Sequence, residues 1–209
     1  MPLQNRVTPF STIEAVDSRG LVMGNRGCLH NNDRALRSQG WRTKSWIICR
    51  LAWKGVRREL MRPRSWTELF FLDEAVALAA GHRPCGYCRR EAYRKFLACW
   101  AAGTGWTQAR PPRQPDVDAR LHADRLDQRR HQRHHDADLE NLPDGSFVLL
   151  PDDPRPWLVR GSALHPWSHS GYGPPRQRPA GVTVSVITPA STVTALAAGY
   201  VPVLHPSIT

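Results

Sequence analysis

The sequence FFLDEAVALAAGHRPCGYCRREAYRKF, at Phe70–Phe96, carries the clearest local structural signals in this chain. Its apolar start predicts a strand over 67–72, and Asp73 is suited to cap a helix over 74–80. Gly81 fits the left-handed position that ends such a helix, and Pro84 prevents the helix from resuming. After the CGYC motif at Cys85–Cys88, the apolar spacing predicts a second helix over 91–101.

The two cysteines of the CGYC motif have the spacing of a metal-binding pair. A tight turn places both sulfur atoms within reach of one ion, at about 2.3 Å for zinc. The neighbouring cations Arg89 and Arg90 favour the thiolate form. A redox role would require the pair at the start of a helix that follows a strand, whereas a helix and a Gly-Pro turn precede it here. We therefore expect Zn²⁺ on Cys85 and Cys88.

A closed tetrahedral zinc site requires two further ligands. Cys28 and His30 are the expected pair, because residues i and i+2 of an extended chain share a face. Cys49 is the reserve ligand, but it alternates with apolar residues and is expected to pack in the core. The predicted metal site is therefore Cys28, His30, Cys85 and Cys88.

The chain has an excess of basic residues. Its 209 residues include 29 Lys and Arg against 18 Asp and Glu, which gives a formal net charge of +11. A field of this sign attracts polyanions, and phosphate contacts are its usual use. We expect a nucleic-acid partner, DNA rather than RNA, and phosphate contacts from Arg26, Arg34, Arg57, Arg58, Arg83, Arg89 and Arg90.

Composition divides the chain into three segments. Residues 1–102 are expected to form a zinc-binding domain with an inserted hairpin over 46–61, residues 103–140 a linker with a short helix, and residues 141–209 a small β-rich domain. We expect an α+β fold of small antiparallel sheets and short helices, with the N-terminal half held by one zinc ion. The sequence shows no apolar run of the roughly 18 residues that a membrane span needs. It also shows no secretory signal, so a cytoplasmic location is expected.

The stretch Phe70–Phe96 resembles the second half of the zinc domain of Ada-type DNA-repair proteins. That module has a strand, a short helix ending in Ala-Ala-Gly, and then x-Arg-Pro-Cys-x-x-Cys-Arg. The matching residues are Phe71, Ala75, Ala79, Ala80, Gly81, Arg83, Pro84, Cys85, Cys88 and Arg89. The resemblance implies a zinc-dependent nucleic-acid-binding module in DNA repair or regulation. The chain as a whole also resembles a group of bacterial proteins, which implies no activity.

The chain departs from the Ada pattern in its first pair of ligands. In that family these form a Cys-x-x-x-Cys pair a short distance upstream, and this sequence contains no such pair. Repair of DNA phosphotriesters by the family uses a zinc thiolate of the first pair as nucleophile. Cys28 is the residue to which that role would fall here.

Two other functions remain open. A metal-dependent nuclease or repair enzyme would act on the phosphate backbone, with Asp118 and His122 on one face of a helix or with Cys28 as nucleophile. A zinc-stabilised protein-interaction domain would show no salt-dependent binding of nucleic acid.

Overall fold

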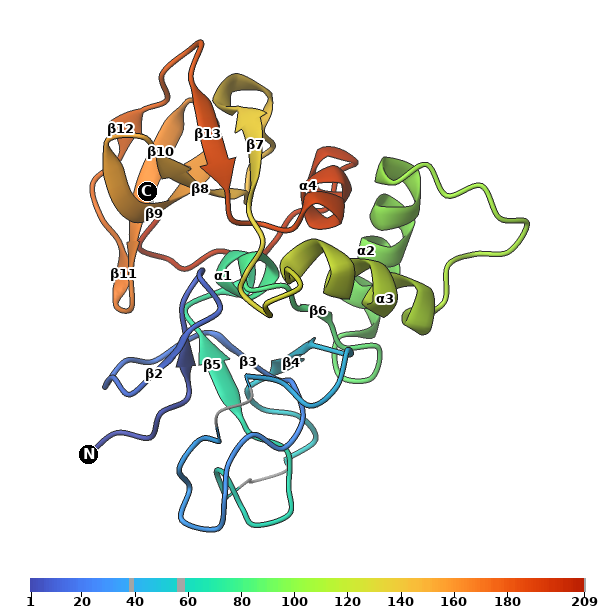
Figure 1. Cartoon of the computed structure of the whole chain (residues 1–209), viewed down its shortest axis with the longest axis vertical. Helices are drawn as coiled ribbons and strands as arrows, with labels where there is room; N and C mark the ends of the chain where they lie inside the picture. The colour runs from blue at the N-terminus through green and yellow to red at the C-terminus, as the bar shows by residue number, and fades with distance from the viewer. Residues whose placement is uncertain (38–39, 56–58, 209) are drawn as a thin grey trace.

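The computed structural model describes residues 1–37, 40–55 and 59–208 and contains two sheets with helices between and beside them (Figure 1). The expected α+β class is confirmed. The first sheet is built from the N-terminal half and the second from residues that follow helix α3. Among the described residues, no helix is long and apolar enough to cross a membrane.

The first sheet has six strands in the order β2-β1-β5-β3-β4-β6. It is mixed, because β1 pairs parallel with β5 and β4 pairs parallel with β6, while the other neighbours are antiparallel. Of the hairpin predicted over 46–61, the first strand is present as β4, which pairs with β3 and β6. Of the return strand predicted over 57–61, residues 57 and 58 lie outside the described residues, and residues 59–61 form no strand. The strands are β1 Arg6–Val7, β2 Ile13–Glu14, β3 Val22–Asn25, β4 Ile47–Arg50, β5 Leu69–Phe71 and β6 Arg83–Pro84.

The second sheet is antiparallel throughout and follows the order β11-β10-β9-β8-β13-β7, with β12 beside β10. Alternation of buried and more exposed residues along the strands sets its register. Val184 and Val186 of β13, for example, are buried in a core cluster that is separate from the cluster around α1. The strands are β7 His135–Asp138, β8 Phe147–Leu150, β9 Asp153–Arg160, β10 Ala163–Ser168, β11 Gly171–Tyr172, β12 Arg176–Gln177 and β13 Thr183–Val186.

Helix α1, Glu74–Ala79, lies between the sheets and is buried along its whole length. Its sequence EAVALA allows this position, since small side chains permit close approach to β5 and β8 on either side. The predicted cap is confirmed, because Asp73 Oδ1 accepts a hydrogen bond from Val76 N at 3.0 Å. Gly81 has the expected positive φ of +84°. The other helices are α2 Arg90–Gly103, α3 Gln114–Arg125, α4 Ala190–Ala197 and a short 3₁₀ turn, η1 Leu139–Asn141.

The start of α1 is bound by residues from the C-terminal part of the chain. Asp73 Oδ2 accepts hydrogen bonds from Tyr172 Oη at 2.8 Å and from His205 N at 3.0 Å. Glu74 accepts from Tyr200 Oη at 2.5 Å and from Val203 N at 3.0 Å. One core cluster accordingly contains side chains from both sheets. The division into segments 1–102, 103–140 and 141–209 stays a prediction, and this cluster crosses it.

We predict that Asp73→Ala lowers the free energy of unfolding by about 3 kcal/mol or more, since it leaves three donors without their acceptor in a buried place. Tyr172→Phe is the matched control and is expected to cost about 1 kcal/mol, because Asp73 keeps its other two donors. Urea denaturation of both variants measures the difference. Equal losses in the two variants would contradict the role given to the carboxylate.

Candidate metal centre

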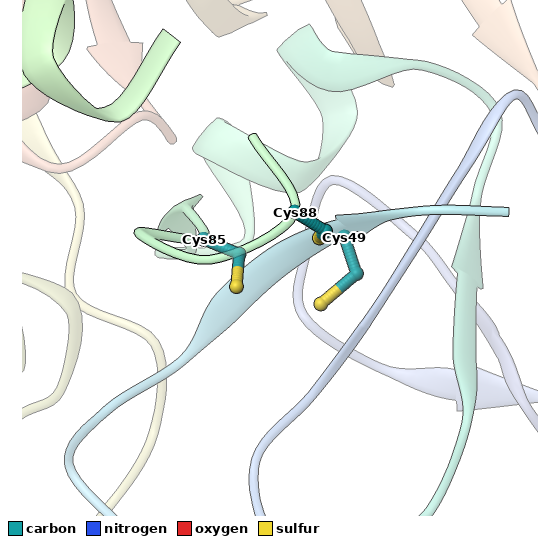
Figure 2. Close-up of side chains that lie close together, drawn as sticks. All are labelled: Cys49, Cys85 and Cys88. Atoms are coloured by element: carbon teal, nitrogen blue, oxygen red, sulfur yellow. The ribbon is translucent and has the colours of Figure 1, made fainter. Parts of the chain in front are cut away.

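Three cysteines meet where the turn after β6 passes over strand β4 (Figure 2). The sulfur atoms of Cys49, Cys85 and Cys88 all lie within 4.8 Å of one another. Cys49 belongs to β4, and the other two belong to the turn between β6 and α2. All three side chains are buried. The group is close enough to hold one metal ion.

The short parallel pairing of β6 with β4 brings the CGYC turn to Cys49. Arg83 N donates to Trp46 O at 3.1 Å, and Cys85 N donates to Ile48 O at 2.9 Å. These bonds place Cys85 beside Cys49, the residue that follows Ile48 on β4. The backbone then turns tightly, with Arg89 N donating to Cys85 O at 3.1 Å, and this turn returns Cys88 to the same side. Backbone hydrogen bonds therefore bring the two segments together at this place.

The three thiols differ in acidity. The pKa of Cys85 is lowered to about 5, first by a hydrogen bond with Cys49 and further by backbone N–H groups, among them that of Tyr87. The pKa of Cys49 is raised by the same thiol contact and by burial, and burial also raises that of Cys88. One thiolate therefore forms readily at neutral pH. A bound metal ion would displace the remaining thiol protons.

The surroundings of the sulfur atoms are apolar. The cysteines share a cluster with Met23, and the partly buried Ile47, Trp53, Trp66 and Phe70 pack against it. Within residues 1–37, 40–55 and 59–208, no fourth His, Cys, Asp or Glu joins the group. A tetrahedral ion bound here would have three sulfur ligands from these residues and one position for water or another ligand.

The structure corrects the expected ligands Cys28 and His30. His30 is buried with both ring nitrogens engaged, Nδ1 with Thr67 Oγ1 at 2.6 Å and Nε2 with Arg62 O at 3.1 Å. Cys28 Sγ lies 3.7 Å from His30 O and is outside the sulfur group. The reason is the strand pairing, which places Cys49 rather than the 28–30 segment beside the CGYC turn. Cys49 is buried as predicted, yet it is also the third member of the site.

A sequence signal for Cys49 was available. Cys49 lies upstream of the CGYC motif in chain order, and cysteine is a residue type that structural zinc sites use. Trp53, four residues further on, packs against the sulfur cluster.

Three of the arginines expected on phosphates have internal partners instead. Arg83 is 1% exposed, and its guanidinium binds both carboxylate oxygens of Asp118, at 2.7 and 2.8 Å. Arg89 donates to Glu74 Oε2 at 2.8 Å. Arg26 is 2% exposed, and its Nε donates to His82 Nε2 at 3.2 Å. Arg83 and Arg89 therefore do not fit the expected role on phosphates, since acids of the chain bind their guanidinium groups, whereas Arg26 Nη2 has no partner among the described residues.

The remaining four predicted arginines fall into two groups. Arg34 is exposed and pairs with Glu59 at 2.7 Å, while Arg90 is exposed at the start of α2. Arg57 and Arg58 lie outside the described residues. Of the predicted phosphate contacts in the described part of the chain, Arg90 therefore fits the expectation best.

The residues considered for nuclease chemistry also have structural partners. Asp118 is buried and its carboxylate is bound by Arg83. His122 Nδ1 lies 3.0 Å from Arg125 Nη2, and burial together with that cation lowers the pKa of His122 to about 4. In the described residues, these two side chains are not part of a metal-ligand group.

Comparisons of the chain with models of protein families, with curated proteins and with solved structures found no match.

We predict that Cys49→Ser lowers metal affinity at least as strongly as Cys85→Ser, whereas Cys28→Ser leaves it unchanged. The reason is that Cys49 supplies one of three converging sulfur atoms, and Cys28 lies outside the group. Titration with Co²⁺ measures this directly, because thiolate-to-cobalt absorption reports the sulfur ligands. Loss of this absorption in Cys28→Ser with retention in Cys49→Ser would contradict the assignment.

We further predict that Asp118→Ala costs about 3–5 kcal/mol of stability, since it leaves the Arg83 guanidinium buried without its counter-charge. The surface pair of Asp152 with Arg176 supplies the control, and Asp152→Ala is expected to change stability by less than about 1 kcal/mol. Thermal or urea unfolding monitored by circular dichroism gives both values. If Asp118→Ala leaves the free energy of unfolding unchanged, the structural role given to Asp118 is contradicted.

Proposed function

We propose that this chain is a zinc-dependent nucleic-acid-binding module whose metal centre, Cys49, Cys85 and Cys88, supports a basic aromatic surface. The observation that carries the proposal is the position of that surface directly against the sulfur group. One shallow cavity of about 280 Å³ has three arginines and one carboxylate in its lining, which consists of Arg50, Trp53, Tyr87, Cys88, Arg89, Arg90, Glu91 and Ala92. A metal ion on the cysteines would fix the two chain segments that form it.

Zinc is the metal that best fits this donor set. Thiolates are soft ligands, and zinc in proteins accepts them in tetrahedral geometry at about 2.3 Å, which corresponds to sulfur separations of about 3.8 Å. The observed separations of at most 4.8 Å require only a small inward movement of the side chains. Three thiolates and one Zn²⁺ leave a net negative charge, and the nearby cations Arg50, Arg89 and Arg90 offset it.

The surface beside the metal centre combines aromatic rings with the exposed cations Arg50 and Lys54. Tyr87 is 70% exposed and lies edge-on to Trp53, with the ring centroids 6.0 Å apart. Lys54 Nζ is 5.8 Å from the Trp53 ring and 5.7 Å from the Tyr87 ring. Arg50 lies over Trp53 at 5.5 Å. Exposed rings with adjacent cations are the usual means of binding single-stranded nucleic acid, through base stacking and phosphate contacts.

The alternatives receive less support from the structure. A nuclease would need free acidic or histidine ligands, and Asp118 and His122 are committed to Arg83 and Arg125. Repair through Cys28 would need that thiol on the metal, but it lies outside the sulfur group. A protein-interaction domain would not require the excess of positive charge, +11 over the chain.

We predict that the zinc-loaded protein binds single-stranded DNA with a clear salt dependence, and that Tyr87→Ala weakens this binding about tenfold through loss of a stacking ring. Lys54→Ala is expected to reduce the slope of log K against log salt by about one unit, because one phosphate contact is lost. Fluorescence anisotropy with a labelled oligonucleotide measures both effects.

Arg160→Ala is the control, since Arg160 is exposed at the end of β9 in the second sheet. It removes the same charge from another surface. The affinity for the oligonucleotide is expected to stay within about twofold of the wild-type value, because only the long-range attraction by the net charge is reduced. Removal of zinc by a chelator should weaken binding in the wild type. Salt-independent binding, or equal effects of the Lys54 and Arg160 variants, would refute the proposed surface.

A further inference from the structure

A second cavity, of about 660 Å³, lies apart from the cysteines. It is bounded by the loop at Phe10, by residues near the start of β4, and by the segment that follows α3. Its aromatic walls include Trp41 and Trp46, and its cationic residues are Arg26, Arg129 and Arg130. None of these residues belongs to the metal centre. The cavity is therefore a separate candidate site, with aromatic and cationic side chains in its lining.

The inner part of this cavity contains a buried arginine without a carboxylate partner. Arg26 is 2% exposed, and its Nη1 donates to Ser11 O at 3.1 Å while its Nε donates to His82. Its Nη2 has no hydrogen-bond partner among the described residues. Its guanidinium carbon lies 4.1 Å from the centre of the Trp46 ring. A buried cation with an unsatisfied donor is costly unless a ligand compensates it.

The neighbouring charges increase this cost. Arg125 lies over the same Trp46 ring at 3.8 Å, and its hydrogen-bond partners are the carbonyl oxygens of Gly81 and Lys44 and the ring nitrogen Nδ1 of His122. The nearby carboxylate of Asp118 is occupied by Arg83. Burial and the charge of Arg125 both lower the pKa of Arg26. The described residues thus leave two buried guanidinium groups at this place without an ion pair of their own.

The outer part of the cavity adds exposed cations and a ring. Arg129 and Arg130 are exposed, and no ion pair involves either of them in the described part of the chain. Trp41 is partly exposed and is held edge-on against His122, with centroids 4.5 Å apart. A dianion at the cationic residues and a planar group against Trp41 would satisfy both features at once.

We propose that this cavity binds a phosphate monoester carried by a nucleoside, with the phosphate toward Arg26, Arg129 and Arg130 and the base against Trp41. The group can come from a free nucleotide or from the phosphorylated end of a nucleic-acid strand. The site is independent of the metal centre, because it shares no residue with the cysteine surface.

The test uses the full chain and adenosine 5′-monophosphate as probe, with calorimetry for affinity and thermal unfolding for stability. The nucleotide is expected to bind and to raise the melting temperature, whereas adenosine is expected to bind at least about tenfold more weakly. The double variant Arg129→Ala/Arg130→Ala should lose at least about tenfold in affinity for the nucleotide. Both side chains are exposed, so the variant keeps its fold.

Arg133→Ala is the matched control, because Arg133 is exposed in the same basic segment but does not line the cavity. It should leave nucleotide affinity unchanged. Binding of both the nucleotide and adenosine with equal affinity, or no loss in the double variant, would overturn the proposal. So would the absence of nucleotide binding together with equal affinities for a 5′-phosphorylated oligonucleotide and its 5′-hydroxyl counterpart.

Competition between two oligonucleotides identifies the source of the phosphate. If the site takes a strand end, a 5′-phosphorylated oligonucleotide displaces the nucleotide more strongly than its 5′-hydroxyl counterpart, and the double variant abolishes the difference. If the site takes a free nucleotide, the 5′-phosphorylated and 5′-hydroxyl oligonucleotides displace the nucleotide to the same extent, and the nucleotide alone still binds. Either result supports the cavity as a phosphate site.

Discussion

The parallel pairing of β6 with β4 is the contact on which both candidate sites depend. Two backbone hydrogen bonds, from Arg83 N to Trp46 O and from Cys85 N to Ile48 O, align the turn with the strand. On one side of β4 this alignment brings Cys85 and Cys88 to Cys49. On the other side it leaves Trp46 buried beneath Arg26 and Arg125. Strand β4 and the residue before it therefore take part in both places, through Cys49 in the sulfur cluster and through Trp46 beneath the two arginines.

Arginine has two distinct uses in this protein. The exposed arginines add to a positive field, while Arg83, Arg89 and Arg125 act inside the fold as donors to carboxylates and to backbone carbonyl oxygens. The planar guanidinium suits both uses, since it offers five donors and stacks on aromatic rings. The 29 Lys and Arg residues thus overstate the number of cations that are free to meet a partner, whereas the net charge of +11 already counts the acids that pair with them.

Local features could be predicted from the sequence, and features that depend on strand pairing could not. The Asp73 cap, helix α1 and the positive φ of Gly81 follow from short-range rules, and the structure confirms them. The CGYC pair was recognised from its spacing. The third sulfur was assigned to the wrong segment because a parallel pair joins residues far apart in the chain, and alternation along β4 indicates only that Cys49 is buried. The inward position of Arg83 and Arg89 does not follow from local patterns for the same reason, since Asp118 and Glu74, which bind them, lie in other elements of the chain.

The hydrogen bonds at the start of α1 have a consequence for the synthesis of the chain. Asp73 and Glu74 receive donors from Tyr172, Tyr200, Val203 and His205. During translation these acids emerge from the ribosome long before their partners do. The start of α1 therefore cannot complete its packing until the chain has been synthesised as far as His205. Before that point the carboxylates of Asp73 and Glu74 lack these four hydrogen-bond donors.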